Sequence, residues 1–204
     1  ALMWHFYHAN SRYHLFAKQL LYSVQISGKK VFPDFNTVWH FDDKVGQKYL
    51  FEAIGAPLVP TYVFYSHKQA LEWSEQTSYP KVFKLRGGAG SSNVRLVRTA
   101  QHAKRLIRKA FGSGFRQYNA ANSLRERWRK YKLGKASVRD LLEGVGHLII
   151  KTKFEKISAK NRGYVYFQDY VPNCQYDIRV KIIGRRCWAF KRIVRENDFR
   201  ASGS

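Results

Sequence analysis

Apolar positions recur at helical spacing in several stretches of the chain. One stretch ends at Gly28, and another lies between Asp42 or Asp43, either of which can serve as an N-cap, and Gly55, which marks a C-terminus. Ser66 and Thr99 each precede a further apolar pattern of the same period and are suitable N-caps. The predicted helices cover residues 15–26, 44–54, 67–73, 100–111 and 137–145.

Other stretches alternate apolar and polar residues or contain short β-branched and aromatic runs, which predict strands. Two period-two runs flank Gly184 and Arg185, the signature of a β-hairpin over residues 176–195. The predicted strands cover residues 30–33, 61–65, 81–85, 93–97, 147–151, 164–171 and the two arms of the hairpin. Helices and strands are mixed without a repeat or a compositional linker, so we expect an α+β fold.

Positive charge is the most unusual bulk property. The 204 residues carry a formal net charge of +23, and their 45% hydrophobic content is ample for a core. A chain this basic usually binds a polyanion such as nucleic acid, an anionic membrane surface or a phosphate-rich substrate. Residues 116–139 hold eight Lys and Arg side chains against the single acid Glu126. They form either a solvated surface or a docking face for an anionic substrate or nucleic acid.

Several functional classes are not indicated by the sequence. No apolar run approaches the roughly 20 residues of a membrane span, and the first residues do not resemble a signal peptide, so we expect a cytoplasmic location. The two cysteines form no Cys-x-x-Cys pair and the histidines lack the spacing of a zinc helix, so no metal site is expected from them. Both ends of the sequence suggest a piece of a longer protein.

Three glycines fall within four positions in "KVFKLRGGAGSSNV", between two predicted strands. The spacing matches neither a Walker loop nor a dinucleotide fingerprint, which requires a helix after the glycines. A glycine-rich hairpin can lie over a nucleotide with its backbone N–H groups toward the phosphates, and Lys84 on the entering strand can add a point charge. The alternative is a plain flexible turn, and composition alone leaves both open.

Three stretches in this order resemble the ATP-grasp superfamily, particularly ribosomal-protein S6 glutamate ligases and glutathione synthetases. They are "DDKVGQKYLFEAIGAPLVPTYVFY", "YPKVFKLRGGAGSSNVRLV" and "FQDYVPNCQYDIRVKIIGRRCWAFKRIVRENDFRASGS". The resemblance covers most of residues 31–115 and 163–204. It implies two α/β lobes with antiparallel sheets that enclose a nucleotide cleft.

The resemblance also implies roles for individual residues. Lys84 and Lys44 match lysines near the nucleotide phosphates, the strand at 168–171 matches the one that lines the adenine, and Asp177 matches the acid that binds the ribose. Arg179, Arg192 and Arg200 match basic residues for a substrate carboxylate, the phosphates or the acyl intermediate. The implied cofactor-binding residues are Lys44, Lys84, Gly87, Gly88, Gly90, Ser91, Ser92, Gln168, Asp169, Tyr170, Val171, Asp177, Ala201 and Ser202; the implied catalytic residues are Arg192 and Arg200, and the implied substrate residue is Arg179.

Asp177 and Arg179 share one strand face, opposite the apolar face of Tyr176 and Ile178, so they face either solvent or a cleft. With the resemblance, the chain divides into an N-terminal region (1–40), a central lobe with the glycine loop (41–115), a basic insertion (116–162) and the start of a C-terminal lobe (163–204).

The implied function is an ATP-dependent ligase that joins a carboxylate to an amine through an acyl phosphate, with ATP and Mg²⁺ as cofactors and metal ligands expected beyond Ser204. Two alternatives remain: a kinase that uses the same fold on a polyanionic small molecule, and a nucleic-acid-binding module that acts through residues 116–139.

Overall fold

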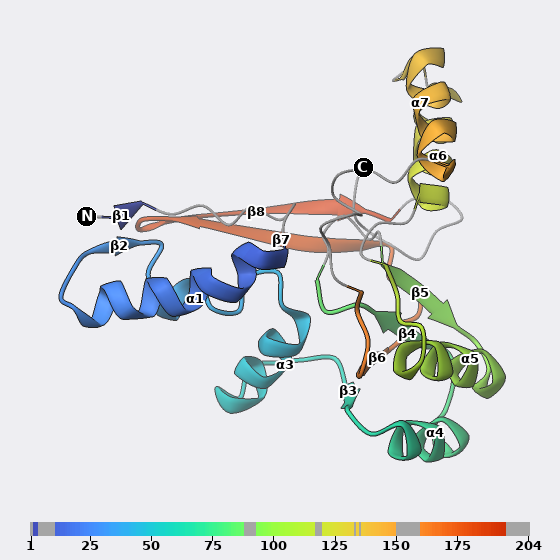
Figure 1. The fold of residues 1–204 in the computed structure, drawn as a ribbon, viewed down its shortest axis with the longest axis horizontal. Helices are drawn as coiled ribbons and strands as arrows, with labels where there is room; N and C mark the ends of the chain where they lie inside the picture. The colour runs from blue at the N-terminus through green and yellow to red at the C-terminus, as the bar shows by residue number, and fades with distance from the viewer. Residues whose placement is uncertain are drawn as a thin grey trace.

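The computed structural model describes residues 2–3, 11–87, 93–116, 120–132, 134, 136–149 and 160–194. Helices and strands alternate irregularly along the chain, as Figure 1 shows. The elements are β1 (Leu2–Met3), α1 (Ser11–Ile26), β2 (Val31–Phe32), α2 (Phe35–Val38), α3 (Lys44–Ala53), β3 (Thr61–Phe64), α4 (His67–Gln76), β4 (Lys81–Lys84), β5 (Val94–Val97), α5 (Ala100–Phe111), α6 (Ala120–Lys132), α7 (Val138–Ile149), β6 (Val165–Asp169), β7 (Tyr176–Ile183) and β8 (Arg186–Ile193).

The main sheet has four strands in the order β3-β6-β4-β5, and the three neighbouring pairs are antiparallel. Strand β6 comes about 70 residues after β5 in sequence, yet it lies between β3 and β4. Lys81 therefore stands opposite Asp169, and Lys84 stands opposite Tyr166. The sheet thus joins residues from both sides of the basic stretch at 116–139.

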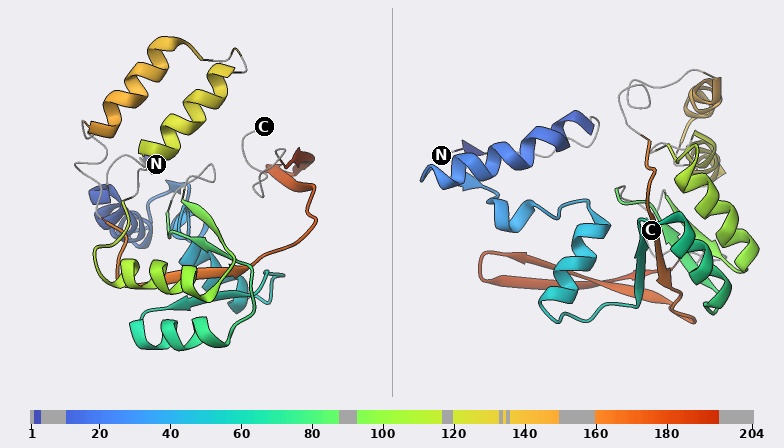
Figure 2. Two further views of the ribbon diagram at one scale, coloured as in Figure 1. Left: turned by 90° about the vertical axis from the view of Figure 1, so that its right-hand side faces the viewer. Right: turned by 60° about the horizontal axis from the view of Figure 1, so that its bottom comes forward.

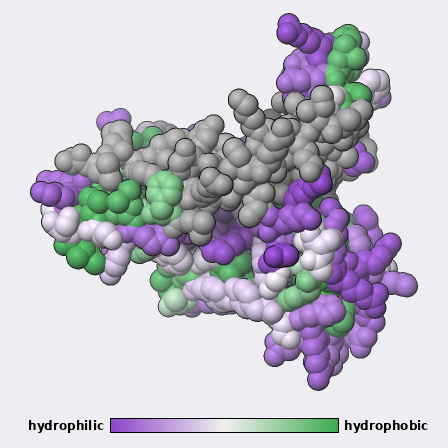
Figure 3. Space-filling view, in the orientation of Figure 1, coloured by the Kyte–Doolittle hydropathy of each residue, from purple (hydrophilic) through white to green (hydrophobic). Residues whose placement is uncertain are grey.

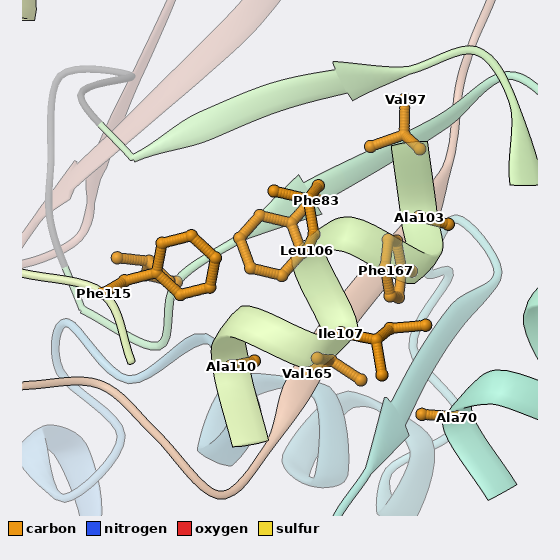
Figure 4. Close-up of a cluster of buried hydrophobic side chains, with 11 residues drawn as sticks. Ala70, Phe83, Val97, Ala103, Leu106, Ile107, Ala110, Phe115, Val165 and Phe167 are labelled. Atoms are coloured by element: carbon orange, nitrogen blue, oxygen red, sulfur yellow. The ribbon is translucent and has the colours of Figure 1, made fainter. Parts of the chain in front are cut away.

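Helices α4 and α5 cover one face of this sheet. Phe83 from β4 and Phe167 from β6 are fully buried there, with ring centroids 5.4 Å apart. Ile107 of α5 belongs to the same cluster (Figure 4), and Trp73 of α4 packs against Phe167 with a centroid distance of 5.0 Å. Burial of this apolar cluster is the main source of stability for the sheet and fixes which face of each strand points away from the helices.

Three other parts surround this body. Strands β1 and β2 form a short parallel pair beside α1, and a small cluster of Ala17, Leu21 and Val38 joins α1 to α2. Strands β7 and β8 form a long antiparallel hairpin. Helices α6 and α7 pack against each other and stand apart from the sheet, as both Figure 1 and Figure 2 show.

The α+β prediction is confirmed. Asp43 caps α3, Ser66 caps α4 and Thr99 caps α5, each by accepting a hydrogen bond from a backbone N–H three residues on. The hairpin turn at Gly184 and the pairing of the strands on either side of the glycine loop are also as predicted.

One predicted element was wrong. Residues 147–149 of the strand predicted at 147–151 instead continue α7 to Ile149, and residues 150–151 lie outside the described part of the chain. Leu141, Val145 and Ile149 are apolar positions at helical spacing. In the sequence, the adjacent β-branched residues Ile149 and Ile150 resembled a strand. The sequence analysis also missed β1, α2 and α6, and it ended α4 three residues too early. Within the described ranges, no helix is both long and apolar enough to cross a membrane.

Candidate functional site

The two faces of the main sheet carry different chemistry. Because side chains alternate along a strand, Lys84 and Gln168 point to the face opposite helices α4 and α5. Lys81 and Asp169 point to the same face as Phe83 and Phe167, which is the helix-covered face. Four polar residues that are close in the sheet therefore form two separate pairs.

Lys84 is the central residue of the first pair. Its Nζ donates a hydrogen bond of 2.5 Å to Oε1 of Gln168. The amide of Gln168 is held in turn, because its Nε2 donates to Oγ1 of Thr61 at 2.9 Å. Burial, with a smaller contribution from the like charge of Lys44, lowers the pKa of Lys84 to about 8. The site thus holds an ammonium group against a neutral amide.

Lys44 reaches this site from a different element. It is the first residue of α3, and its backbone N–H donates to the backbone oxygen of Arg86 at 2.9 Å. This bond joins the start of α3 to the chain just after β4. Burial lowers the pKa of Lys44, although Asp42 and Asp43 act in the opposite direction. Two desolvated lysines from distant positions in the sequence are therefore brought within electrostatic range of each other.

Asp43 anchors the junction between α1, α3 and β4. Its Oδ1 accepts the N–H of Gly46, and its Oδ2 lies 2.5 Å from Nη2 of Arg86 and 3.8 Å from Nζ of Lys18. Burial opposes ionisation of this carboxyl, but the hydrogen bonds from Arg86 and Gly46 outweigh it and lower its pKa. A buried carboxylate that caps a helix and binds two cations fixes the position of Lys44 beside it.

The glycine stretch connects two paired strands. Lys84 stands opposite Val94, and the backbone N–H of Leu85 donates to the oxygen of Asn93 at 3.2 Å. The hydroxyl of Tyr164 accepts the N–H of Arg86 at 2.7 Å. Burial raises the pKa of this tyrosine to about 12, so its hydroxyl stays protonated. The two ends of the loop are held by hydrogen bonds directly beside Lys84, and Gly87 is half-buried where the loop begins.

Asp177 and Arg192 form a pair on the β7–β8 hairpin. They stand opposite each other in register, and the guanidinium contacts both carboxylate oxygens, with Nε 2.7 Å from Oδ1 and Nη2 on Oδ2. Arg179 lies two residues along on the same face, opposite Phe190. The predicted grouping of Asp177 with Arg179, away from Tyr176 and Ile178, agrees with this register. Two predicted site residues, Asp177 and Arg192, are thus direct partners.

Asp169 does not share a face with Lys84. Its Oδ1 lies 2.5 Å from Nζ of Lys81, whose side chain is only 5% exposed and lies over the ring of Tyr62 at 5.1 Å. Its backbone N–H donates to the oxygen of Pro60 at 2.9 Å. The side chain of Asp169 therefore secures the end of β6, and Tyr170 and Val171 follow directly after this secured end.

Seven of the predicted site residues lie outside the described part of the chain: Gly88, Gly90, Ser91, Ser92, Arg200, Ala201 and Ser202. Among the residues that the structure describes, no group of three or more His, Cys, Asp or Glu side chains could hold a metal ion.

Sequence reasoning missed most of the supporting residues. Thr61, Lys81, Arg86 and Tyr164 were not predicted to matter, and Asp43 was predicted only as a helix cap. Arg86 had a local signal, since it lies between Lys84 and the first glycine. The pairing of Lys81 with Asp169 had none, because it depends on the position of β6 in the sheet.

Comparisons with known proteins give structural matches only. No protein-family model matches the chain, and no curated protein matches its sequence. D-alanyl-alanine synthetase A from Vibrio cholerae matches 89% of this chain and 42% of its own length, at 9% identity and a TM-score of 0.47. D-alanine-D-alanine ligase from Helicobacter pylori matches 88% and 43%, at 8% identity and a TM-score of 0.44.

The biotin carboxylase domain of 2-oxoglutarate carboxylase from Hydrogenobacter thermophilus, in complex with MgADP, ADP and bicarbonate, matches 76% of this chain and 26% of its own length. Its identity is 16% and its TM-score 0.41. The chain thus spans less than half the length of each of these three proteins.

Proposed function

We propose that this chain contains the nucleotide-binding part of an ATP-grasp enzyme that joins a carboxylate to an amine. The observation that carries the proposal is Lys84. It is a desolvated lysine with a pKa of about 8, it points away from the helix-covered face, and it lies directly before a glycine-rich hairpin loop. A lysine that serves only a structural role would be expected to have a carboxylate partner, as Lys81 has in Asp169.

Phosphate oxygens supply the negative charge that Lys84 and Lys44 attract. A bound triphosphate would relieve the repulsion between the two ammonium groups and stabilise the protonated form of each. Gln168 holds Lys84 in place, and the backbone bond from Lys44 to Arg86 holds the start of α3 beside it. The site is thus preorganised for a group with several negative charges, as phosphoryl transfer requires.

The remaining nucleotide contacts follow from the resemblance. The adenine would lie against the segment after β6, where Tyr170 and Val171 supply apolar surface. The ribose hydroxyls would bind Asp177. Because Arg192 already holds the carboxylate of Asp177 through both of its oxygens, a ribose must share or displace that contact.

The proposed reaction has two steps. A carboxylate oxygen of the substrate attacks the γ-phosphorus of ATP, the bond from that phosphorus to the bridging oxygen of ADP breaks, and an acyl phosphate forms. The amine then attacks the acyl carbon, inorganic phosphate leaves, and the amine loses a proton. Lys84 and Lys44 neutralise the charge on the transferred phosphoryl group, and Arg179 and Arg192 are our candidates for holding the carboxylate and the acyl phosphate. A cytoplasmic location, where ATP is available, is part of the same proposal.

A thermal-shift titration with Mg-ATP tests nucleotide binding. A ligand at a hundred times its Kd adds about 2.7 kcal/mol to the free energy of unfolding. We expect this stabilisation in the native chain, its loss in Lys84→Ala and its retention in the control Lys68→Ala, since Lys68 is a highly exposed lysine on α4. Equal stabilisation of all three proteins, or of none, would contradict the assignment of Lys84.

A second candidate function keeps the nucleotide site and changes the acceptor. The formal net charge of +23 favours a heavily anionic substrate, which a kinase of small polyanions would have. Hydroxylamine separates the two reactions, because only an acyl phosphate is converted to a hydroxamate. A hydroxamate formed in the presence of ATP and a carboxylate supports the ligase, whereas ATP consumption with a phosphorylated hydroxyl product supports the kinase.

A further inference from the structure

The helical appendage, α6 and α7, leaves and rejoins the body at one place. Phe115 and Asn161 form an antiparallel bridge in which each backbone N–H donates to the other residue's oxygen at 2.8 Å. Among the described elements, α6 and α7 contact chiefly each other. Figures 1 and 2 show the two helices standing clear of the sheet. This arrangement adds little to the core, and its surface is open to a partner.

Helix α6 packs on α7 through one side. An added Cβ at Gly144 of α7 would meet Leu124 and Arg127 of α6 at 2.9 Å, so the helices approach closely at this glycine. Arg127 also donates to the backbone oxygen of Asp140 at 2.7 Å and pairs with Glu143 at 3.0 Å. These contacts account for the side of α6 that faces α7 and leave its other side as a separate surface.

That other side of α6 carries a row of cations with an aromatic ring among them. Arg125, Trp128, Arg129 and Lys132 follow the spacing i, i+3, i+4 and i+7, which places them on one face of a helix. Trp128 is 50% exposed, Arg125 and Lys132 are exposed, and the ammonium of Lys132 lies over the Trp128 ring at 5.6 Å. The row spans about 10 Å along the helix axis, at 1.5 Å per residue.

We propose that this row of α6 is a docking surface for single-stranded nucleic acid. Its cations neutralise successive backbone phosphates, and the exposed ring of Trp128 stacks on an unpaired base between them. The length of the row fits about three nucleotides of a stacked strand at about 3.4 Å each. Base stacking explains why an exposed aromatic residue lies among the cations of this row.

The same row does not fit a lipid surface. A helix that enters a bilayer interface separates its aromatic and apolar residues from its basic ones. On α6 they share one face, while the exposed apolar side chains Val138 and Leu142 lie on the neighbouring helix. The part of the appendage seen in Figure 3 has hydrophilic and hydrophobic areas beside each other. A duplex is also less suitable, because its stacked bases offer no free face to Trp128.

Fluorescence anisotropy with a labelled 12-nucleotide oligo(dT), titrated at several salt concentrations without ATP, tests the proposal. We expect Trp128→Ala to weaken binding about tenfold, within the range for one stacked base, and Trp128→Phe to retain most of the affinity. Lys132→Gln should reduce the slope of log affinity against log salt by about 0.7, the value for one phosphate contact on a single strand.

Three controls make the outcome decisive. Lys68→Gln removes an exposed charge from α4 and should leave the salt slope nearly unchanged. Lys84→Ala should retain oligo(dT) binding, which separates this surface from the nucleotide site. Circular dichroism of each variant checks that α6 is intact.

Several results would overturn the proposal. One is equal binding by the native chain, Trp128→Ala and Lys132→Gln. Another is tighter binding to a 12-base-pair duplex that does not depend on Trp128. A third is the absence of oligo(dT) binding together with binding to vesicles of phosphatidylserine that Leu142→Ser abolishes.

Discussion

The main sheet and the β7–β8 hairpin are both antiparallel, and both carry basic residues beside apolar ones, but their environments differ. In the sheet, Phe83, Phe167 and Lys81 are buried, and Lys84 is desolvated. In the hairpin, nearly every side chain is exposed, including apolar ones such as Ile182 at 73%. Charge in the sheet is constrained by burial and therefore carries a shifted pKa or a fixed partner. In the hairpin, Asp177 and Arg192 pair with each other, and the other charged side chains are exposed.

The largest expected difference between the two regions is in core packing. Phe167→Ala should lower the free energy of unfolding by about 3–5 kcal/mol, because it removes a fully buried ring that contacts Phe83 and Trp73. The matched hairpin variant Phe190→Ala should cost less than about 1 kcal/mol, since that ring is 42% exposed. Urea denaturation measures both. Similar losses would show that the hairpin is part of the same cooperative core.

The next difference concerns the ion pair of the sheet. Lys81→Met should cost about 2 kcal/mol, less than for a fully buried pair, because the side chain of Asp169 is 34% exposed and can be partly hydrated. The double variant Lys81→Met/Asp169→Leu should recover much of this loss, since no unpaired charge is left. A double-mutant cycle by urea denaturation gives the coupling energy. A coupling below about 0.5 kcal/mol would mean that Lys81 does not secure β6.

The sequence predicted those parts of this comparison that depend on local patterns. The caps Asp43, Ser66 and Thr99 and the turn at Gly184 are local signals, and they gave the right helices and the right hairpin. The position of β6 between β3 and β4 is a pairing across about 70 residues of sequence, which no local pattern encodes.

The candidate site was predictable only in part for the same reason. Lys84 was a candidate from its position before the glycines, and Lys44 was assigned only from the resemblance. The contacts that bring the two lysines together were not visible in the sequence. Those contacts are the hydrogen bond from the backbone N–H of Lys44 to the backbone oxygen of Arg86, and the ion pairs of Asp43 with Arg86 and Lys18. The strand predicted at 147–151 failed for a different reason, because here the local pattern itself was ambiguous. A short apolar run at a helix end has the composition of a strand.

The third prediction uses the pKa of Lys84. The folded-state pKa of about 8 is below the ordinary value of 10.5, so above pH 8 the free protein increasingly holds this lysine neutral. A bound triphosphate favours the charged form, so binding that raises this pKa by one unit should make the Kd for ATP rise about fourfold between pH 8 and pH 9.5. Isothermal titration calorimetry measures this rise. Lys84→Arg, which stays charged, should show a much smaller pH dependence.

The same lysine predicts the sign of a stability effect. Because its pKa is lower in the folded chain than in the unfolded chain, the unfolded chain binds more protons between pH 8 and 10.5. The Lys84 contribution to the free energy of unfolding should therefore rise with pH across this window, and it should be absent from Lys84→Met. Stability that falls with pH in the native chain relative to Lys84→Met would contradict the desolvation of this lysine.

The smallest expected effect on stability is at the ion pair of the hairpin. Arg192→Gln should cost at most about 1 kcal/mol, and less in high salt, because Asp177 and Arg192 are 37% and 23% exposed and water can replace the lost contact. Its effect on ATP affinity should be larger than its effect on stability, since the hairpin pair is proposed to meet the ribose and the transferred phosphoryl group. Lys81→Met should show the reverse, a large loss of stability with a small direct effect on ATP affinity at a temperature where the chain is folded. Parallel measurements of unfolding and of ATP binding for Arg192→Gln and Lys81→Met therefore test whether the exposed pair serves the ligand and the buried pair serves the fold. If the change in ATP affinity relative to the change in the free energy of unfolding is the same for both variants, the two pairs do not differ in this way.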